Sequence, residues 1–241
     1  MLTNVCSRGI IVLVIDMLER IKKDPILLNI LGILDNVHLI SDGKWDWEHG
    51  RKHAFRVSYY TGKILSDLGE TAETIELGKI AGLLHDIGLI TGIKKGHAKE
   101  SEKYAKIFLD NYNINIQDKE IILNAIRNHS IGTNITSNVG LALLLADKID
   151  LASHRVENST IQDEVNEEFM KVMNVEISIT NQNIYINYKA KESFNISILN
   201  SWDKAIIIPF KVAKYLGKKC MFFLNEQYLE VKECYDGYQF T

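Results

Sequence analysis

Apolar side chains recur every three or four positions through much of the first 155 residues, which is the spacing of one face of an α-helix. Between residues 48 and 155 this spacing predicts five helices, separated by glycine, serine and other turn residues. Their expected ranges are 48–68, 71–87, 97–112, 118–129 and 138–155. We expect Asp118 to be the N-cap of the fourth, because its side chain can accept from the free N–H groups of a first turn. Residues 17–40 favour one or two further short helices, divided near Pro25.

The pattern changes after about residue 160. Apolar and polar residues alternate over 175–188, which predicts a β-hairpin. A helical stretch is expected near 197–217, and a second hairpin over 220–231 that turns at Asn225 and Glu226. Together these elements predict a mainly α protein with a helical core and a small C-terminal α+β appendage. The expected domains are a helical lead (1–47), a helical domain (48–158) and a small α+β domain (159–241).

Composition narrows the class of protein. Of 241 residues, 46% are apolar and 24% charged, as in an ordinary globular protein. The net charge is −3 and no basic stripe is present, so nucleic acid is not an expected partner. No run approaches the roughly 18 apolar residues of a membrane span, and the three cysteines form no CxxC pair. We therefore expect a cytoplasmic protein without a membrane partner or a thiolate zinc site, and Met17 is an alternative start.

Six of the seven histidines lie between residues 49 and 154, in the same region as two carboxylates on apolar faces. Asp86 follows His85 at the end of the run 81–88, and Asp147 follows six apolar residues. Burying an ionised carboxylate costs several kcal/mol unless it is paired or bound to a cation. Asp147 could pair with Lys148 or Arg155. A divalent metal shared with the histidines would satisfy both carboxylates.

The order of these residues resembles the HD-domain metal-dependent phosphohydrolases, whose pattern is a histidine, a later His-Asp pair and a final aspartate on a helical core. The resemblance covers about residues 48–155 and rests on the segments HAFRV (53–57), GLLHDIG (82–88) and LLADKID (144–150). It implies that one divalent ion is held by His53, His85, Asp86 and Asp147. His49 lies one turn before His53 and is an alternative first ligand, but no Arg-Val pair follows it. We expect His49 and His154 to be flanking residues.

Two further histidines indicate a branch of the family. His97 and His129 stand where some branches add histidines to hold a second metal, with Asp86 as the bridge. The arrangement is most similar to bacterial hydrolases that split dinucleoside tetraphosphates symmetrically. Cyclic-dinucleotide phosphodiesterases are also similar, but their Gly-Tyr-Pro signature is missing. Many relatives place a lysine where Leu89 stands, so no phosphate contact is expected there.

The expected function is hydrolysis of a phosphate ester or anhydride of a nucleotide or dinucleotide by metal-activated water. Imidazole and carboxylate ligands suit one or two ions of Fe, Mn, Co, Ni, Zn or Mg. The residues expected in catalysis are Asp86, His85 and Lys148. The residues expected to bind metal are His53, His85, Asp86, His97, His129 and Asp147.

Several alternatives remain open. The helical domain could be a regulatory nucleotide-binding module without turnover, or a metal-dependent nuclease. A phosphorylated small molecule is the expected partner, and the hairpins could supply edge strands for a homodimer. Lys148 and Arg56 could contact phosphate or form ion pairs with neighbouring acids. Trp45 and Trp47 could stack on a base, although we favour a role in fastening their loop.

Overall fold

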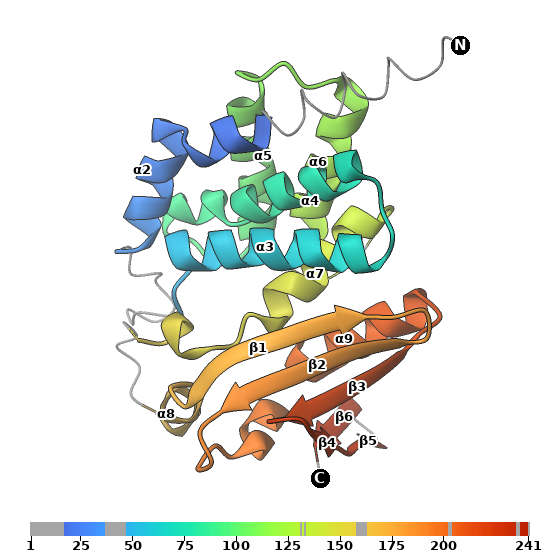
Figure 1. Ribbon diagram of the computed structural model, residues 1–241. Coiled ribbons are helices and arrows are strands. Elements are labelled where there is room, and N and C mark those ends of the chain that lie inside the picture. The colour runs from blue at the N-terminus through green and yellow to red at the C-terminus, as the bar shows by residue number, and fades with distance from the viewer. Residues whose placement is uncertain are drawn as a thin grey trace, which may run out of the picture. The chain divides into compact units, whose positions relative to one another are not determined.

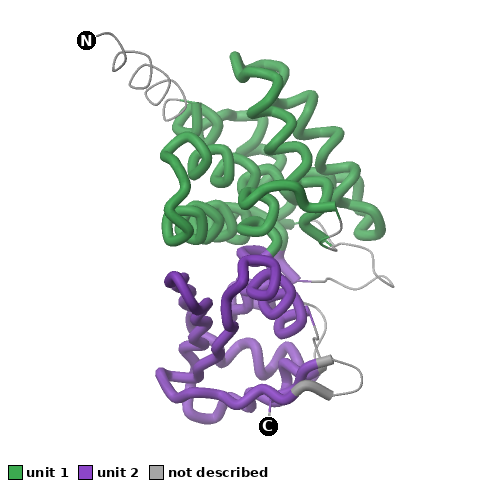
Figure 2. The backbone as a smooth tube through the Cα atoms, turned by 90° about the vertical axis from the view of Figure 1, so that its right-hand side faces the viewer, with its two compact units in different colours: residues 1–37, 49–144 green, residues 38–48, 145–241 purple. Residues whose placement is uncertain are grey.

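The computed structural model describes residues 17–36, 47–130, 132, 134–157, 163–201, 204–234 and 237–240. The chain forms two compact units (Figure 2). Unit 1 consists of residues 1–37 and 49–144, and unit 2 of residues 38–48 and 145–241. The alternative start region before Met17, and Trp45, lie outside the described residues.

Unit 1 is a bundle of helices around an apolar core (Figure 1). Its elements are α2 (Pro25–Leu34), α3 (Arg51–Asp67), α4 (Ala72–Leu84), the 3₁₀ helix η1 (Ile87–Thr91), α5 (His97–Leu109), α6 (Ile116–Asn128) and the first part of α7 (Asn138–Ile149). The apolar positions that predicted these helices are those that the structure buries, for example Ile64, Ile80 and Ile126. The all-α interpretation of this region is therefore confirmed.

Several helix ends differ from the prediction. The N-cap of α6 is Asn115, whose Oδ1 accepts the backbone N–H of Asp118 at 2.8 Å, so the expectation that Asp118 is the cap was wrong. Helix α4 ends at Leu84 instead of reaching residue 87. Helix α7 ends at Ile149, and the 3₁₀ helix η2 (Ser153–Arg155) follows it. None of the helices in the described part of the chain has both the length and the apolar character that crossing a membrane requires.

Unit 2 contains the small sheet that the alternating pattern predicted. Strands β1 (Val172–Ile179) and β2 (Asn183–Ala190) form the first hairpin, and β3 (Lys219–Leu224) and β4 (Gln227–Leu229) form the second. Asn225 and Glu226 turn the second hairpin with φ of 48° and 68°. The sheet order is β1-β2-β3-β4, because β2 and β3 pair in parallel across α9 (Lys204–Tyr215).

Further elements of unit 2 lie outside the four-stranded sheet. They are α8 (Glu164–Phe169), the 3₁₀ helix η3 (Ile196–Ser201), and the separate strand pair β5 (Val231–Cys234) and β6 (Gly237–Phe240). Phe210 of α9 lies 5.7 Å from Phe222 of β3, ring centroid to centroid, and 4.1 Å from Tyr238 of β6. One face of the sheet is thereby covered. The fold is mainly helical with a small α+β part, as expected.

Candidate metal centre

Asp86 lies where the chain leaves a helix. His85 is the C-cap of α4, and Asp86 has φ −111° and ψ 6°, a conformation between helix and strand that is frequent at active sites. In a continuous helix, adjacent side chains diverge by about 100°. Because the helix ends before Asp86, both side chains can reach the same place. Both are buried, with 0% of His85 and 3% of Asp86 exposed.

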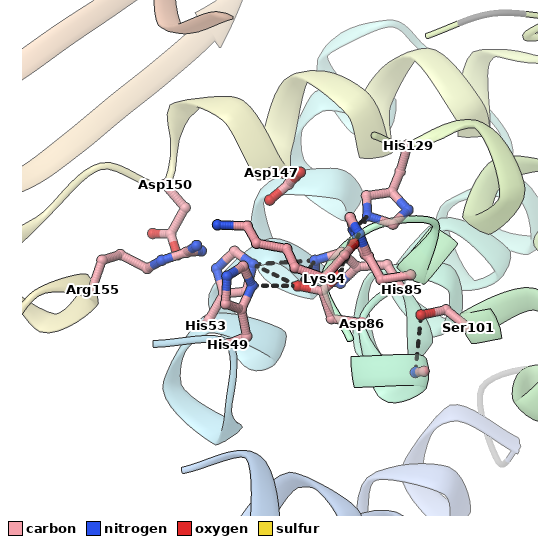
Figure 3. A network of polar contacts seen from close by, with 12 residues as sticks. His49, His53, His85, Asp86, Lys94, Ser101, His129, Asp147, Asp150 and Arg155 are labelled. Carbon is pink, nitrogen blue, oxygen red and sulfur yellow. Dashed lines mark hydrogen bonds and ion pairs between the residues drawn. The ribbon is translucent and has the colours of Figure 1, made fainter. Parts of the chain in front are cut away.

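The chain beyond Asp86 is held close to α5. Gly88 donates its backbone N–H to Oγ of Ser101 at 3.0 Å (Figure 3). A Cβ atom at Gly88 would lie 2.6 Å from the carbonyl carbon of Glu100, so only glycine allows this approach. The contact places the start of η1 against α5, the helix that begins with His97.

Five imidazoles surround the Asp86 carboxylate, divided between its two oxygens (Figure 3). The oxygen Oδ2 lies 2.7 Å from Nδ1 of His49, 3.2 Å from Nε2 of His85 and 3.6 Å from Nε2 of His53. The oxygen Oδ1 lies 3.3 Å from Nε2 of His129 and 3.5 Å from Nε2 of His97. The carboxylate therefore faces the pair His53 and His85, together with His49, through Oδ2, and the pair His97 and His129 through Oδ1.

Three of these histidines are oriented in the same way by their own backbone. Nδ1 of His85, His97 and His129 lies 2.7–2.8 Å from the carbonyl oxygen three residues earlier, in Gly82, Lys94 and Ile126. A carbonyl oxygen only accepts, so each Nδ1 carries a proton, and each Nε2 presents a lone pair when the imidazole is neutral. At the ends of α4 and α6 these carbonyls belong to the last turn, whose oxygens have no partner within the helix.

The Nε2 atoms of each pair are close: 3.1 Å between His53 and His85, and 3.1 Å between His97 and His129. When His97 and His129 are neutral, both of these atoms present lone pairs, and the anionic Oδ1 of Asp86 is buried beside them without a hydrogen bond of good geometry. Such a group repels itself unless a proton or a metal cation lies among its members. Two nitrogen ligands about 2.1 Å from one ion would stand about 3.0–3.4 Å apart, as these do. The arrangement fits a metal ion.

The neighbouring histidines also keep the Asp86 carboxyl group ionised. Burial by itself would raise the pKa of the Asp86 carboxyl. Without an ion, the charges of protonated His85 and His49 and the N–H groups that His129 and His49 direct at the carboxylate oppose this effect, and together they hold the pKa well below its usual range. Asp86 is therefore an anion, as a metal ligand must be.

Part of this chain is similar to known proteins. Residues 50–157 match the HD domain. Ribonuclease Y of Oceanobacillus iheyensis is 27% identical over 141 residues, and Ribonuclease Y of Staphylococcus epidermidis is 29% identical over the same length. Each alignment covers 58% of this chain but 24% of the relative, so the chain spans about a quarter of the curated relatives it matches. A crystal structure of a predicted HD superfamily hydrolase from an uncultured Thermotogales bacterium shares 28% identity over 51% of this chain and 65% of its own, with a TM-score of 0.40.

The structure also places the remaining residues that the sequence singled out. Asp147 lies near the end of α7, a continuous helix within which unit 1 ends, and only 8% of it is exposed. Its carboxylate forms an ion pair with Lys148, one of the alternatives left open. One of its oxygens also lies within 4.8 Å of a ring nitrogen of His53 and of His85, so these three residues could share an ion.

His49 was misplaced by the sequence interpretation. It is not a flanking residue, because its Nδ1 makes the shortest contact with Asp86. Helix α3 begins at Arg51 after an N-cap at Gly50, so His49 precedes the helix and helical spacing could not place it. His154, by contrast, pairs with Asp150 in unit 2, Nε2 to Oδ2 3.2 Å.

Arg56, Lys94 and Leu89 differ in whether they can contact a phosphate. Arg56 donates to the hydroxyl of Tyr60 at 3.0 Å. Leu89 is fully buried in η1, so this position cannot contact a phosphate. Lys94 also extends its side chain toward the histidines (Figure 3). The sequence interpretation missed Lys94. This residue is followed by a second lysine in a loop, and nothing in the sequence distinguishes it from an ordinary exposed lysine.

Proposed function

We propose that this protein is a metal-dependent phosphohydrolase that hydrolyses a phosphate ester or anhydride at the centre around Asp86. The observation that carries the proposal is the buried carboxylate whose two oxygens face two histidine pairs. A divalent ion bound there would polarise phosphoryl oxygens and lower the pKa of a bound water. The complete set of charged and imidazole groups favours turnover over a purely regulatory module.

The residues divide into two sets. His53, His85, Oδ2 of Asp86 and Asp147 would hold one ion, and His97, His129 and Oδ1 of Asp86 a second. The backbone carbonyls of Gly82, Lys94 and Ile126 keep three Nε2 atoms free of protons for this purpose. Lys148 and Lys94 offer ammonium groups for a phosphate, Lys148 from its ion pair with Asp147.

The ligand assignment is tested by metal analysis of the purified protein after reconstitution with Mn²⁺ or Fe²⁺. Asp86→Asn and Asp147→Asn preserve side-chain shape but remove the charge, so we expect metal content and hydrolysis to fall together. Asp67→Asn is the control, because Asp67 pairs with Lys63 on α3 and does not contact the centre. If the Asp86 and Asp147 variants keep full metal content, the assignment is wrong.

The substrate we propose first is a nucleotide or dinucleoside polyphosphate, as the resemblance to the symmetrical dinucleoside-tetraphosphate hydrolases implies. We propose that the protein acts in the cytoplasm, that its partner is a phosphorylated small molecule of this class, and that it forms a homodimer. The net charge of −3 means that long-range attraction of a polyphosphate is weak, so binding would depend on the metal centre and the nearby lysines.

A second candidate substrate is single-stranded RNA. The curated relatives named above are ribonucleases by name. Unit 2 also carries three aromatic side chains on the sheet face opposite α9: Tyr185, Phe223 and Tyr228. Phe223 lies between the other two, with ring centroids 6.1 and 5.8 Å away, and 60% of Tyr228 is exposed. The bases of single-stranded RNA can stack on aromatic rings of this kind. Tyr185 is far from the other two in sequence, and the parallel pairing of β2 with β3 brings it beside Phe223.

A substrate panel separates the two candidates. The reconstituted protein is incubated with a dinucleoside tetraphosphate, mononucleotides and a labelled RNA oligonucleotide, and product release is measured. If RNA is the substrate, Tyr228→Ala should raise KM for RNA because a stacking surface is lost, and should leave cleavage of small substrates unchanged. If RNA is cleaved no faster than by metal alone, the second candidate is rejected. If RNA is cleaved but Tyr228→Ala leaves its KM unaltered, the three aromatic rings do not bind it.

A further inference from the structure

His49 contacts the centre in a different way from the other histidines. It approaches Oδ2 of Asp86 through Nδ1, at 2.7 Å, whereas the other four approach through Nε2 at 3.2–3.6 Å. The first distance is that of a hydrogen bond with a charged partner, and the others are distances between ligands of a shared ion. His49 is nearly buried, with 12% of its side chain exposed, and its ring meets that of His53 edge to face at 5.6 Å.

The proton on this contact can be assigned from the acceptor. An ionised carboxylate oxygen only accepts, so Nδ1 of His49 carries the hydrogen and donates it. A carboxylate oxygen has two lone pairs, and Oδ2 can therefore accept from His49 while its other lone pair faces His53 and His85. The bond fixes the rotation of the carboxylate, and this rotation decides whether Oδ1 points at His97 and His129.

We propose that His49 is the positioning residue of the metal centre, whose Nδ1–H donor holds the Asp86 carboxylate in the orientation that serves both histidine pairs. This inference rests on the proposed function. The competing role is that of a direct ligand, because His49, His53 and Asp86 also place three ligand atoms within 4.8 Å of one another. The substitution His49→Asn separates these two roles, because asparagine can replace a hydrogen-bond donor but not a metal ligand. The amide nitrogen of asparagine stands near the place of a histidine Nδ1 and can donate, but it is a poor metal ligand.

The test uses the full chain with Co²⁺ as the probe metal. Affinity is measured by competition with a chelator, stoichiometry by metal analysis at saturation, and ligand geometry by the visible absorption of Co²⁺. For His49→Ala we expect affinity to fall about 10–100-fold, as for other outer partners of metal ligands, with stoichiometry and the shape of the Co²⁺ spectrum unchanged. For His49→Asn we expect most of the affinity to return.

Two controls make the outcomes distinct. His154→Asn changes a histidine of equal exposure that pairs with another carboxylate, and it should bind Co²⁺ like the wild type. Circular dichroism of the metal-free variants confirms that they are folded. A wild-type affinity in His49→Ala, an equal loss in His49→Asn, or a changed spectrum and lower stoichiometry would each overturn the positioning role. If the wild-type protein itself binds no Co²⁺, the proposed function fails and the inference fails with it.

Discussion

The two oxygens of the Asp86 carboxylate contact different histidines, and we therefore expect different effects when individual histidines are replaced. His97 and His129 approach only Oδ1, so they should serve one ion and leave the other in place. We expect His97→Ala and His129→Ala each to lower metal content from about two ions per chain toward one, since two-metal sites share a bridging ligand. Metal analysis by mass spectrometry measures this directly. Unchanged occupancy in both variants would exclude the second ion.

The same residues show what the sequence can and cannot predict at this scale. His85, Asp86 and Asp147 end apolar runs, where a polar residue needs an explanation, and the structure does bury them. His49 has no such context, because it stands among polar residues before α3 and only the tertiary fold brings it to Asp86. The division of Asp86 between two histidine pairs is likewise a matter of rotamer and distance, and no spacing in the sequence encodes it.

At the scale of elements, the centre depends on how closely α3 and α4 approach. Gly82 lies where the two helices meet: a Cβ atom there would stand 2.6 Å from Cα and 2.7 Å from the backbone nitrogen of Ser58. Gly82→Ala should force apart the helices that carry His53 and His85, lowering the free energy of unfolding by about 1–3 kcal/mol. Metal affinity should fall as well. Chemical denaturation and chelator competition measure the two effects.

Gly78→Ala is the matched control on the same helix. A Cβ atom at Gly78 would meet the end of the Leu65 side chain, which can move, and not the backbone. Alanine also has a helix propensity about 1 kcal/mol better than that of glycine, which offsets part of the crowding. If Gly78→Ala and Gly82→Ala cost the same stability and the same metal affinity, the close backbone contact does not decide the geometry of the centre.

The turn of the β3–β4 hairpin in unit 2 is the basis of a second prediction at the scale of elements. Asn225 adopts φ 48°, and its side chain accepts from the backbone N–H of Ala190 at 3.0 Å and donates to the Ala190 carbonyl at 2.9 Å. Asn225→Ala loses both bonds and places alanine in a left-handed conformation, so unfolding should become easier by about 1–3 kcal/mol. Asn181→Ala, in the exposed turn between β1 and β2, is the control for denaturation experiments. Equal losses would contradict this role.

Local patterns account for most of the elements but not for their pairing. The 3.6-residue spacing and the alternation over 175–188 mark helices and hairpins, because each reports the period of one buried face. The parallel pairing of β2 with β3 depends on the crossover through α9, and neither strand alone indicates it. The β5–β6 pair is too short, at four residues each, to show a pattern.

At the scale of the whole molecule, the polypeptide itself connects unit 2 to the metal centre. Trp47 and Glu48 belong to unit 2, and the next residue, His49, belongs to unit 1. The indole N–H of Trp47 donates to Oδ1 of Asn166 at 2.8 Å, and its ring meets Phe169 of α8 edge to face at 4.9 Å. The backbone N–H of Glu48 donates to the Arg155 carbonyl at 2.7 Å. Trp47 therefore fastens its loop, as expected from the sequence, and does so two residues before His49.

Because of this connection, we expect a substitution inside unit 2 to lower metal affinity at Asp86. Trp47→Phe keeps an aromatic ring beside Phe169 but removes the donor to Asn166, a residue with 7% exposure, so unfolding should cost about 1–3 kcal/mol less. Because the backbone before His49 is then held less firmly, Co²⁺ affinity should fall, though less than in His49→Ala. Asn166→Ala should cause the same loss, and combining it with Trp47→Phe should add little, since both remove one hydrogen bond. If Trp47→Phe lowers stability while Co²⁺ affinity stays at the wild-type value, then His49 is held by the residues of unit 1 alone.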